Sequence, residues 1–202
     1  MEFEKIVEVL TDEYDYAKNN YVPIIRDESA KYLYNFVKEN KIKNVLEIGT
    51  AIGYSGSIIL SAGAEKLTTI DINHDYLNIA KNTFEKCGFS DFVSVYEEDA
   101  KLVLPRLCEK CEKFDMVFLD GAKGQYIRYL PVLTKLLSQG GVIFADNVLL
   151  HGLVEKDGVV PHRKRTMVVN LREYLNVVNE YPYETELIRL EDGIAITRYK
   201  GE

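Results

Sequence analysis

The sequence contains few cysteines and no long apolar run, and each shortage excludes a class of protein. Three cysteines among 202 residues, an odd number, do not fit a disulfide framework and are expected of a protein kept in a reducing cytoplasm. No segment approaches the length of a membrane span, and the acidic N-terminus does not resemble a signal peptide, so we expect neither membrane insertion nor secretion. A formal net charge of −7 argues against a protein that coats nucleic acid, although it leaves room for a local basic patch.

Internal repeats, low-complexity tracts and flexible linkers are also missing. A composition with 47% hydrophobic and 28% charged residues is that of a globular protein long enough to bury a full core. Cys108 and Cys111 form a C-x-x-C pair without a second pair or a nearby histidine, so we interpret them as structural thiols. We therefore predict a single domain over residues 1–202, with two N-terminal helices in residues 1–43, the second of which has Asp27 as its N-cap.

Five apolar runs, separated by helical stretches, each end on or beside an acidic residue. Alternating strands and helices are typical of a parallel, doubly wound α/β sheet, which binds ligands outside the carboxyl ends of its strands. Carboxylates gathered there would repel one another unless a cationic or hydroxyl-bearing ligand binds among them. The predicted strands are Asn44–Ile48, Lys66–Ile70, Phe92–Glu97, Phe114–Leu119 and Gly141–Ala145, and the acidic residues are Glu47, Asp71, Asp99, Asp120 and Asp146.

The C-terminal part of the chain has a different pattern. After a loop, Val148–Pro161, we predict a helix over Arg163–Glu180 and two alternating strands, Glu184–Leu190 and Ile194–Tyr199. The Asp-Gly pair between these strands is typical of a tight hairpin, so they should be antiparallel. A mostly parallel seven-stranded sheet with a C-terminal antiparallel hairpin fits a Rossmann-like class I methyltransferase fold better than a dinucleotide-binding fold.

A glycine-containing loop, Glu47–Ser55, follows the first predicted strand and opens a helix. Its Gly49 and Gly53 have the spacing Gly-x-x-x-Gly, which differs from the Gly-x-Gly-x-x-Gly that seats a pyrophosphate. An acidic residue before the first glycine suits a cationic ligand, and Asp71 at the end of the next strand can accept both hydroxyls of a ribose. An adenosine attached to a sulfonium, as in S-adenosylmethionine, meets these requirements.

Asp120 and Asp146 end the fourth and fifth predicted strands, which should be neighbours, and Asn147 follows directly. Two carboxylates and an amide oxygen are ligands suited to Mg²⁺ or another hard divalent cation, and they would make a poor zinc site. Either aspartate alone would more often cap a helix or a turn. Their placement at adjacent strand ends predicts a metal site.

The chain resembles the metal-dependent O-methyltransferases typified by catechol and caffeoyl-CoA O-methyltransferases. The resemblance rests on Val22–Ile25, Glu47–Ser55, Thr69–Asp71, Glu98–Ala100, Asp120–Lys123 and Asp146-Asn147. It implies that Val22 and the residues after it, with Ile25 as a further member, fold over the methionine end of the cofactor as a lid. The implied cofactor contacts are Glu47, Gly49, Thr50, Gly53, Ser55, Asp71, Ala100 and Asp120, and Asp99 stands beside them at its own strand end.

The same resemblance assigns Lys123 to catalysis beside Asp120. A substrate hydroxyl held at a cation site loses its proton more easily, and the oxyanion can attack the sulfonium methyl in line. Lys123 would act either as the general base or as an ammonium group that holds the oxyanion. The family also implies a homodimer.

Four basic residues, His162 to Arg165, which we call the basic run, precede the last predicted helix. Such a run usually lies on a solvated face. Cations oppose the macrodipole at a helix N-terminus, however, so an anionic substrate is an equally open interpretation of their placement there. In this run and in His151–Val154 the chain looks like the bacterial branch that methylates 5-hydroxyuridine in tRNA. We therefore expect Arg163, Lys164 and Arg165 to contact tRNA phosphates, which would make the protein a tRNA-processing enzyme.

Two alternatives remain open. A small-molecule catechol-type O-methyltransferase would share every catalytic residue and leave the basic run without a substrate role. A non-catalytic S-adenosylmethionine-binding module, which belongs to a different class of function, would require Asp120, Asp146 and Lys123 to be incidental.

Overall fold

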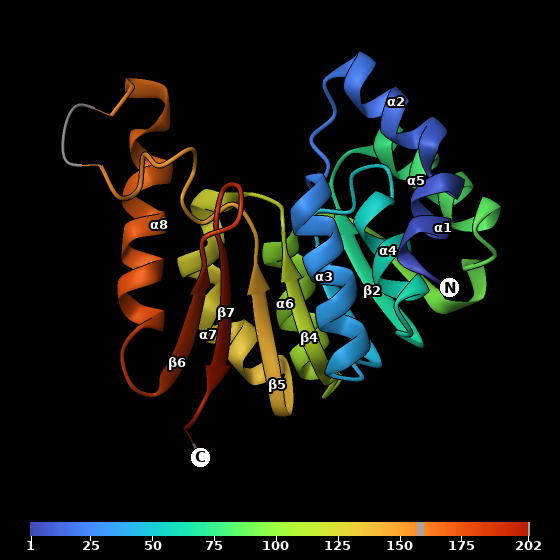
Figure 1. Ribbon diagram of the computed structural model, residues 1–202. Coiled ribbons are helices and arrows are strands. Elements are labelled where there is room, and N and C mark those ends of the chain that lie inside the picture. Colours follow the sequence, from blue (N-terminus) through green and yellow to red (C-terminus); the bar gives the residue numbers. More distant parts are fainter. Residues whose placement is uncertain (157–159, 202) are drawn as a thin grey trace. The chain divides into compact units, whose positions relative to one another are not determined.

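Seven strands form one sheet in the order β3-β2-β1-β4-β5-β7-β6. Figure 1 shows β4, β5, β7 and β6 of the C-terminal half side by side in this order. Strand β2 pairs parallel with both β1 and β3, and β4 pairs parallel with β5. Strand β7 pairs antiparallel with both β5 and β6. This topology confirms the predicted fold class. The strands are β1 Asn44–Ile48, β2 Lys66–Asp71, β3 Val93–Glu97, β4 Phe114–Leu119, β5 Leu137–Ala145, β6 Tyr183–Ile188 and β7 Ile194–Tyr199.

The computed structural model describes residues 1–156 and 160–201, so part of the predicted loop Val148–Pro161 and the last residue lie outside the described residues. The chain divides into two units, Met1–Val103 and Leu104–Glu202, and the single domain over residues 1–202 stays a prediction. The helices are α1 Phe3–Val9, α2 Thr11–Asn20, α3 Asp27–Glu39, α4 Tyr54–Ser61, α5 His74–Lys86, α6 Ala100–Glu109, α7 Tyr126–Leu136 and α8 Arg165–Val178. Short 3₁₀ turns are η1 Ser90–Phe92, η2 Lys123–Gln125 and η3 His162–Lys164.

In the first unit, α4 packs against α1, α3, α5 and β2. In the second, α7 packs against α8, β4 and β5, and α8 also contacts β6 and η2. Nearly every residue of β1 and β4 is buried, as expected for strands covered on both faces. The helices therefore shield the strands, and the acidic residues that follow them lie at the strand ends.

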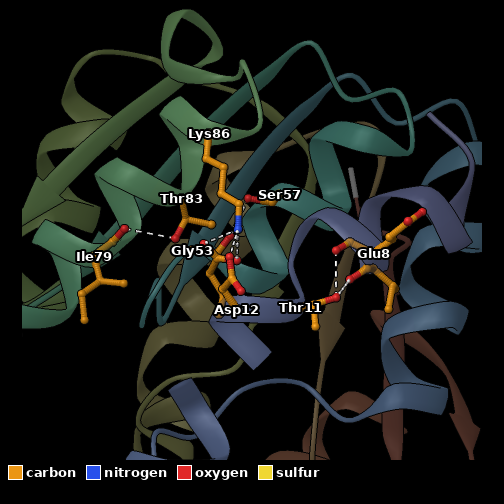
Figure 2. Close-up of polar contacts among 10 residues, drawn as sticks. Glu8, Thr11, Asp12, Gly53, Ser57, Ile79, Thr83 and Lys86 are labelled. Carbon is orange, nitrogen blue, oxygen red and sulfur yellow. Dashed lines mark hydrogen bonds and ion pairs between the residues drawn. The ribbon is translucent and has the colours of Figure 1, made fainter. Parts of the chain in front are cut away.

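The N-terminal segment forms three helices where the sequence predicts two. The first expected helix breaks at Leu10, whose φ of −89° and ψ of 13° depart from helical values, and α2 starts at Thr11. The Thr11 hydroxyl donates to the Glu8 carbonyl at 2.8 Å (Figure 2). A side-chain donor thus takes an acceptor at the C-terminal end of α1, which helps to end that helix.

Helix α2 is tied to the C-terminal end of α5 by an ion pair (Figure 2). The Lys86 ammonium lies 3.0 Å from a carboxylate oxygen of Asp12 and 3.0 Å from one of Glu13. Nothing in the local pattern of either helix indicates this contact, because the partners are more than 70 residues apart.

The boundaries of further elements differ from the prediction. Strand β2 ends at Asp71 rather than Ile70, β3 begins at Val93 rather than Phe92, and β6 spans Tyr183–Ile188 rather than Glu184–Leu190. Strand β5 begins at Leu137 rather than Gly141, because Leu137 pairs with Phe114 before a register shift at the start of the strand. A Cβ at Gly141 would lie 2.9 Å from the Phe114 carbonyl oxygen, so this close approach requires glycine. Helix α3 starts at Asp27 itself, with Arg26 at the N-cap position, so the predicted N-cap role of Asp27 is wrong; its carboxylate instead accepts from the Tyr14 hydroxyl at 3.1 Å.

Helix α8 starts at Arg165 rather than Arg163, because η3 comes first and takes up three residues of the basic run.

Candidate active site

The loop after β1 turns on two glycines. Gly49 has a φ of 108° and Gly53 a φ of 81°, both in the left-handed region that side chains disfavour. A Cβ at Gly53 would also lie 3.2 Å from the Ala80 backbone, so the loop approaches α5 closely at this point. The Ser57 hydroxyl donates to the Gly53 carbonyl at 2.8 Å, which ties the turn to α4 (Figure 2). These contacts make the loop a tight turn.

Glu47 is fully buried near the end of β1, and its carboxylate is hydrogen-bonded to residues that hold the loop. Its two carboxylate oxygens accept hydroxyl protons from Ser55 and Thr69, each at 2.6 Å, and the Thr50 and Thr69 hydroxyls are 2.5 Å apart. From the sequence, Glu47, Thr50 and Ser55 were expected to contact the cofactor, whereas Thr69 had no expected role. In the structure all four form one buried hydrogen-bonded cluster that braces the loop, and their contact with a cofactor stays a prediction.

Asp71 links the end of β2 to the same loop. One of its carboxylate oxygens accepts from the Ala51 N–H and the other from the Asn73 N–H, both at 2.9 Å. Each carboxylate oxygen has a further lone pair, so this partly exposed group can still accept two hydroxyl protons. The geometry is compatible with the predicted ribose contact and orients the carboxylate for it.

Asp99 and Ala100 lie where β3 leads into α6. The Asp99 carboxylate accepts from the Lys101 N–H at 2.9 Å and lies 3.0 Å from the Lys101 ammonium. This backbone hydrogen bond, followed by the lysine side chain, lowers the pKa of Asp99 below its usual range. Asp99 thus stays ionised at the start of α6, and Ala100 next to it is buried.

The predicted lid segment is packed against the first unit. Val22 and Ile25 are buried, and the Val22 N–H donates to the Ala17 carbonyl at 3.0 Å. Tyr21, with a φ of 56° and a side chain that is 93% exposed, turns the chain out of α2 just before them. The structure places the segment between α2 and α3, and its action as a lid stays a prediction.

In the second unit, Asp120 and Asp146 follow β4 and β5 and are close enough for the charge of one to raise the pKa of the other. The Lys123 ammonium lies 3.1 Å from an Asp120 oxygen, and both side chains are largely buried. Burial raises the pKa of Asp120, and the lysine charge opposes this rise. The predicted pair of carboxylates and the predicted lysine therefore form one buried charged cluster.

Asp146 is the least satisfied member of this cluster. Burial, with the charge of Asp120 as the second cause, raises the pKa of Asp146 to about 7. Its Oδ1 accepts from the Asn147 N–H at 2.8 Å, whereas its buried Oδ2 has no hydrogen-bond partner within residues 1–156 and 160–201. An unpartnered carboxylate oxygen in a buried acidic pair is costly to the protein alone. It is the position that a divalent cation would satisfy.

Asn147 begins a loop whose backbone is unusual. Asn147, Leu150 and His151 all have φ values between 46° and 56° without being glycine. The turn between β6 and β7 holds this loop: the Leu149 N–H donates to the Asp192 carbonyl at 2.8 Å, and the His151 N–H to the Asp192 carboxylate at 3.1 Å. Strained backbone persists where surrounding contacts impose it. The Asp-Gly turn, which the sequence predicts only as a hairpin, is thus also a support for the candidate metal loop.

Tyr126 is a further member of the site, and it was not predicted from the sequence. It is fully buried, and its hydroxyl donates to the Leu119 carbonyl at 2.9 Å and to the Asp146 carbonyl at 3.3 Å. Its position three residues after Lys123, at the start of a helix, could have indicated a role in the site. An isolated aromatic residue at a helix start, however, is more often a core residue without a functional role.

The basic run lies on η3 and the first residue of α8. Arg163 and Arg165 are exposed, and Lys164 is half-buried. The Nε–H of Arg165 donates to the Val160 carbonyl at 3.2 Å, and this hydrogen bond orients the guanidinium group while it remains exposed. The run is therefore accessible to an anionic partner.

Two absences among the described residues bear on the predictions. No helix in residues 1–156 and 160–201 is long and apolar enough to cross a membrane. Within the same ranges no group of three or more histidine, cysteine, aspartate and glutamate side chains is arranged to hold a metal. The predicted ligand set has only two such side chains, together with one amide, and the metal site stays a prediction.

Comparison with known proteins identifies the family. A catechol O-methyltransferase of Danio rerio is 32% identical over 184 residues, which cover 88% of this chain and 66% of the relative. Among solved structures, a Staphylococcus aureus protein provisionally named a caffeoyl-CoA O-methyltransferase superposes with a TM-score of 0.85 at 32% identity, covering 96% of this chain and 92% of that one. A Bacillus cereus O-methyltransferase in complex with S-adenosylhomocysteine has the same fold, with a TM-score of 0.83 at 24% identity over 99% and 92% of the two chains. The sequence profile of the O-methyltransferases matches residues 4–200, and the chain belongs to this family of enzymes.

Proposed function

We propose that the protein transfers a methyl group from S-adenosylmethionine to a substrate hydroxyl, with the aid of a divalent cation held by Asp120, Asp146 and Asn147. The observation that carries this proposal is the unpartnered buried Oδ2 of Asp146 beside Asp120 and Lys123. Membership of the O-methyltransferase family supports the reaction class. The test is to measure methyl transfer to a catechol and to tRNA that lacks the 5-methoxyuridine modification, each with and without chelator.

The residues of the first unit would bind the cofactor. Asp71 would accept the ribose hydroxyls, and the turn at Gly49 and Gly53 would let the backbone approach the adenosine and methionine parts. The S-adenosylhomocysteine held by the Bacillus cereus relative supports this choice of cofactor. The buried carboxylate of Glu47 would favour a cationic sulfonium through its charge.

The residues of the second unit would hold the reacting hydroxyl. Asp120, Asp146 and the Asn147 amide oxygen are hard ligands that fit Mg²⁺, which when bound would favour ionisation of the substrate hydroxyl. Lys123 would accept the hydroxyl proton or hold the oxyanion as an ammonium group. Burial of this cluster excludes water, and a water-poor site favours a step in which opposite charges neutralise each other.

For the substrate we propose 5-hydroxyuridine in the anticodon loop of tRNA, converted to 5-methoxyuridine. Its hydroxyl stands beside a carbonyl, a pair of oxygens that a divalent cation can chelate, and bases of a loop can be splayed out for the enzyme without opening a duplex. Exposed Arg163 and Arg165 support an anionic substrate. A small catechol-type molecule is the second candidate, and the names of the Danio rerio and Staphylococcus aureus relatives favour it.

Replacing Asp71 with alanine should weaken S-adenosylmethionine binding by roughly 1–3 kcal/mol, because the ribose hydroxyls lose their acceptor. Isothermal titration of the variant against the parent measures this difference. Asp75→Ala, which removes an exposed carboxylate from the first turn of α5, is the matched control and should bind like the parent. Parental affinity in Asp71→Ala would show that Asp71 does not bind the ribose.

Neutralising Arg163, Lys164 and Arg165 together, each to glutamine, should weaken binding of every tRNA, modified or not, because phosphate contacts position a nucleic acid without reading its sequence. The slope of log affinity against log salt should flatten by about 0.7–0.9 for each phosphate that the variant no longer neutralises. Filter binding over a salt series measures both effects, and turnover of a small catechol should hardly change.

A control with the same change in charge uses glutamine at Lys31, Lys38 and Lys41, which should leave tRNA binding nearly intact. Equal loss on tRNA and catechol in the basic-run variant would mean that the run only supports the fold. Unchanged activity on both substrates would leave the small-molecule reaction as the function.

We also propose that the enzyme is a homodimer in the cytoplasm, as the family resemblance implies. Helix α2 and the residue after it leave Tyr16 and Tyr21 exposed, 41% and 93% respectively, and large exposed aromatic side chains favour an interface. Sedimentation equilibrium of the parent and of a variant with serine at both positions would test this surface.

A further inference from the structure

Tyr126, the first residue of α7, contacts the backbone of both strand ends that carry the candidate metal ligands. Its hydroxyl has one proton, which it shares between the Leu119 carbonyl at 2.9 Å and the Asp146 carbonyl at 3.3 Å. Leu119 directly precedes Asp120, and Asp146 is itself a candidate ligand. One side chain therefore links the two positions from which the carboxylates project.

These contacts continue the sheet beyond its last regular pair. The β4–β5 ladder ends with Leu119 opposite Ala145. The Asp146 N–H donates to the Leu119 carbonyl at 2.9 Å, and the Tyr126 hydroxyl approaches the same carbonyl. The ladder ends here, so the hydroxyl adds a second link, beside this backbone hydrogen bond, between the strand ends that carry Asp120 and Asp146.

Tyr174 of α8 provides a matched comparison within the same cluster. Its ring meets that of Tyr126 edge-on, with centroids 5.7 Å apart and planes at 72°, and it too is fully buried. Its hydroxyl, by contrast, is buried without a hydrogen-bond partner among the described residues. The two tyrosines therefore share burial and packing but differ in what their hydroxyls contact.

We propose that Tyr126 is a positioning residue that sets the geometry of the divalent cation site by holding the Leu119 and Asp146 carbonyls together. This inference rests on the metal-dependent function proposed above. Hydrogen-bond partners outside the ligand set commonly contribute tenfold or more to metal affinity by orienting the ligands. Tyr126 contacts the backbone carbonyl of the ligand Asp146 rather than its carboxylate, and it would orient this ligand in the same manner.

The test is a titration of the chelator-treated, full-length protein with Mn²⁺ in the presence of saturating S-adenosylhomocysteine, with free Mn²⁺ read by electron paramagnetic resonance. Tyr126→Phe should bind Mn²⁺ about 10-fold more weakly than the parent, in line with the removal of supporting hydrogen bonds at other metal sites. Tyr174→Phe should bind Mn²⁺ like the parent. The affinity for S-adenosylhomocysteine, measured by calorimetry, should be the same in all three proteins.

Three results would overturn the inference. The first is parental Mn²⁺ affinity in Tyr126→Phe. The second is an equal loss of Mn²⁺ affinity in Tyr174→Phe, and the third is a loss in Tyr126→Phe matched by weaker S-adenosylhomocysteine binding, since the last two would indicate general loosening of the fold. Asp146→Ala separates this inference from the function on which it rests. If Asp146→Ala binds Mn²⁺ as tightly as the parent, the metal function itself fails; if only Tyr126→Phe does, the positioning role alone fails.

Discussion

Asp146→Ala should lower methyl transfer at least about 1,000-fold, because a metal that stabilises developing charge contributes several kcal/mol and each 1.36 kcal/mol is tenfold in rate. The variant loses one of the two carboxylates that fit the cation. Chelator should produce the same loss in the parent, and Mg²⁺ should restore the parent but not the variant. Initial rates with radiolabelled S-adenosylmethionine on tRNA and on catechol measure the effect.

The same substitution should not lower the stability of the metal-free protein. In the absence of metal, the Oδ2 of Asp146 is buried without a partner among the described residues, so its removal should leave the melting temperature of the metal-free protein unchanged or raise it. Asp115→Ala, which removes a carboxylate from β4 that accepts from the Ser138 hydroxyl, serves as the control and should keep its activity. Full parental turnover in excess chelator would exclude the metal-dependent reaction.

Lys123→Met should lower kcat by about 10²–10⁴, the usual contribution of a positioned proton-transfer group, while the Kd of S-adenosylmethionine stays close to that of the parent. The Lys123 ammonium lies 3.1 Å from Asp120, and its positive charge opposes a second cation there. Mn²⁺ affinity should therefore be equal or tighter in the variant. A loss of kcat together with retained or improved metal binding distinguishes a catalytic lysine from one that merely supports the site.

Lys123→Arg separates the two roles of this lysine, because arginine keeps the positive charge but does not serve as a base near neutral pH. Recovery of most of the activity in Lys123→Arg would indicate that the ammonium group holds the oxyanion. Activity as low as in Lys123→Met would indicate proton transfer. Parental kcat in Lys123→Met would remove the lysine from catalysis, and an absence of turnover by the parent on every hydroxyl substrate would favour a non-catalytic S-adenosylmethionine-binding module.

The strands and their acidic ends could be predicted from the sequence because both depend on local patterns. The predicted limits of β1, β4 and β7 agree with the structure, and the Asp-Gly pair correctly indicated the antiparallel turn before β7. These patterns can be recognised in short stretches of sequence: apolar runs of strand length, turn residues, and the alternation of strands and helices. Once the fold class was identified, the carboxyl-end rule placed Asp120 and Asp146 at the edge where ligands bind.

Other features were decided by contacts between residues far apart in the chain. Glu47 was expected to face a ligand, but the hydroxyls of Ser55 and Thr69 surround it in the structure, and Thr69 is 22 residues away. Asp192, expected only to form a hairpin, holds the His151 N–H across 41 residues. The break between α1 and α2, by contrast, is local. Apolar residues at helical spacing, Phe3, Ile6, Leu10 and Tyr14, run across it and concealed it.

The sequence alone determined which residues stand at the ends of the strands, because strand formation and chain order depend on neighbours. Only the tertiary structure decided what those residues contact. The Tyr126 hydroxyl reaches Asp146 because β4 and β5 pair and α7 packs on both strands, and the Oδ2 of Asp146 stays without a partner among the described residues because that packing buries it. Hydrogen-bond satisfaction of a buried group is a property of the assembled core, and no local pattern encodes it.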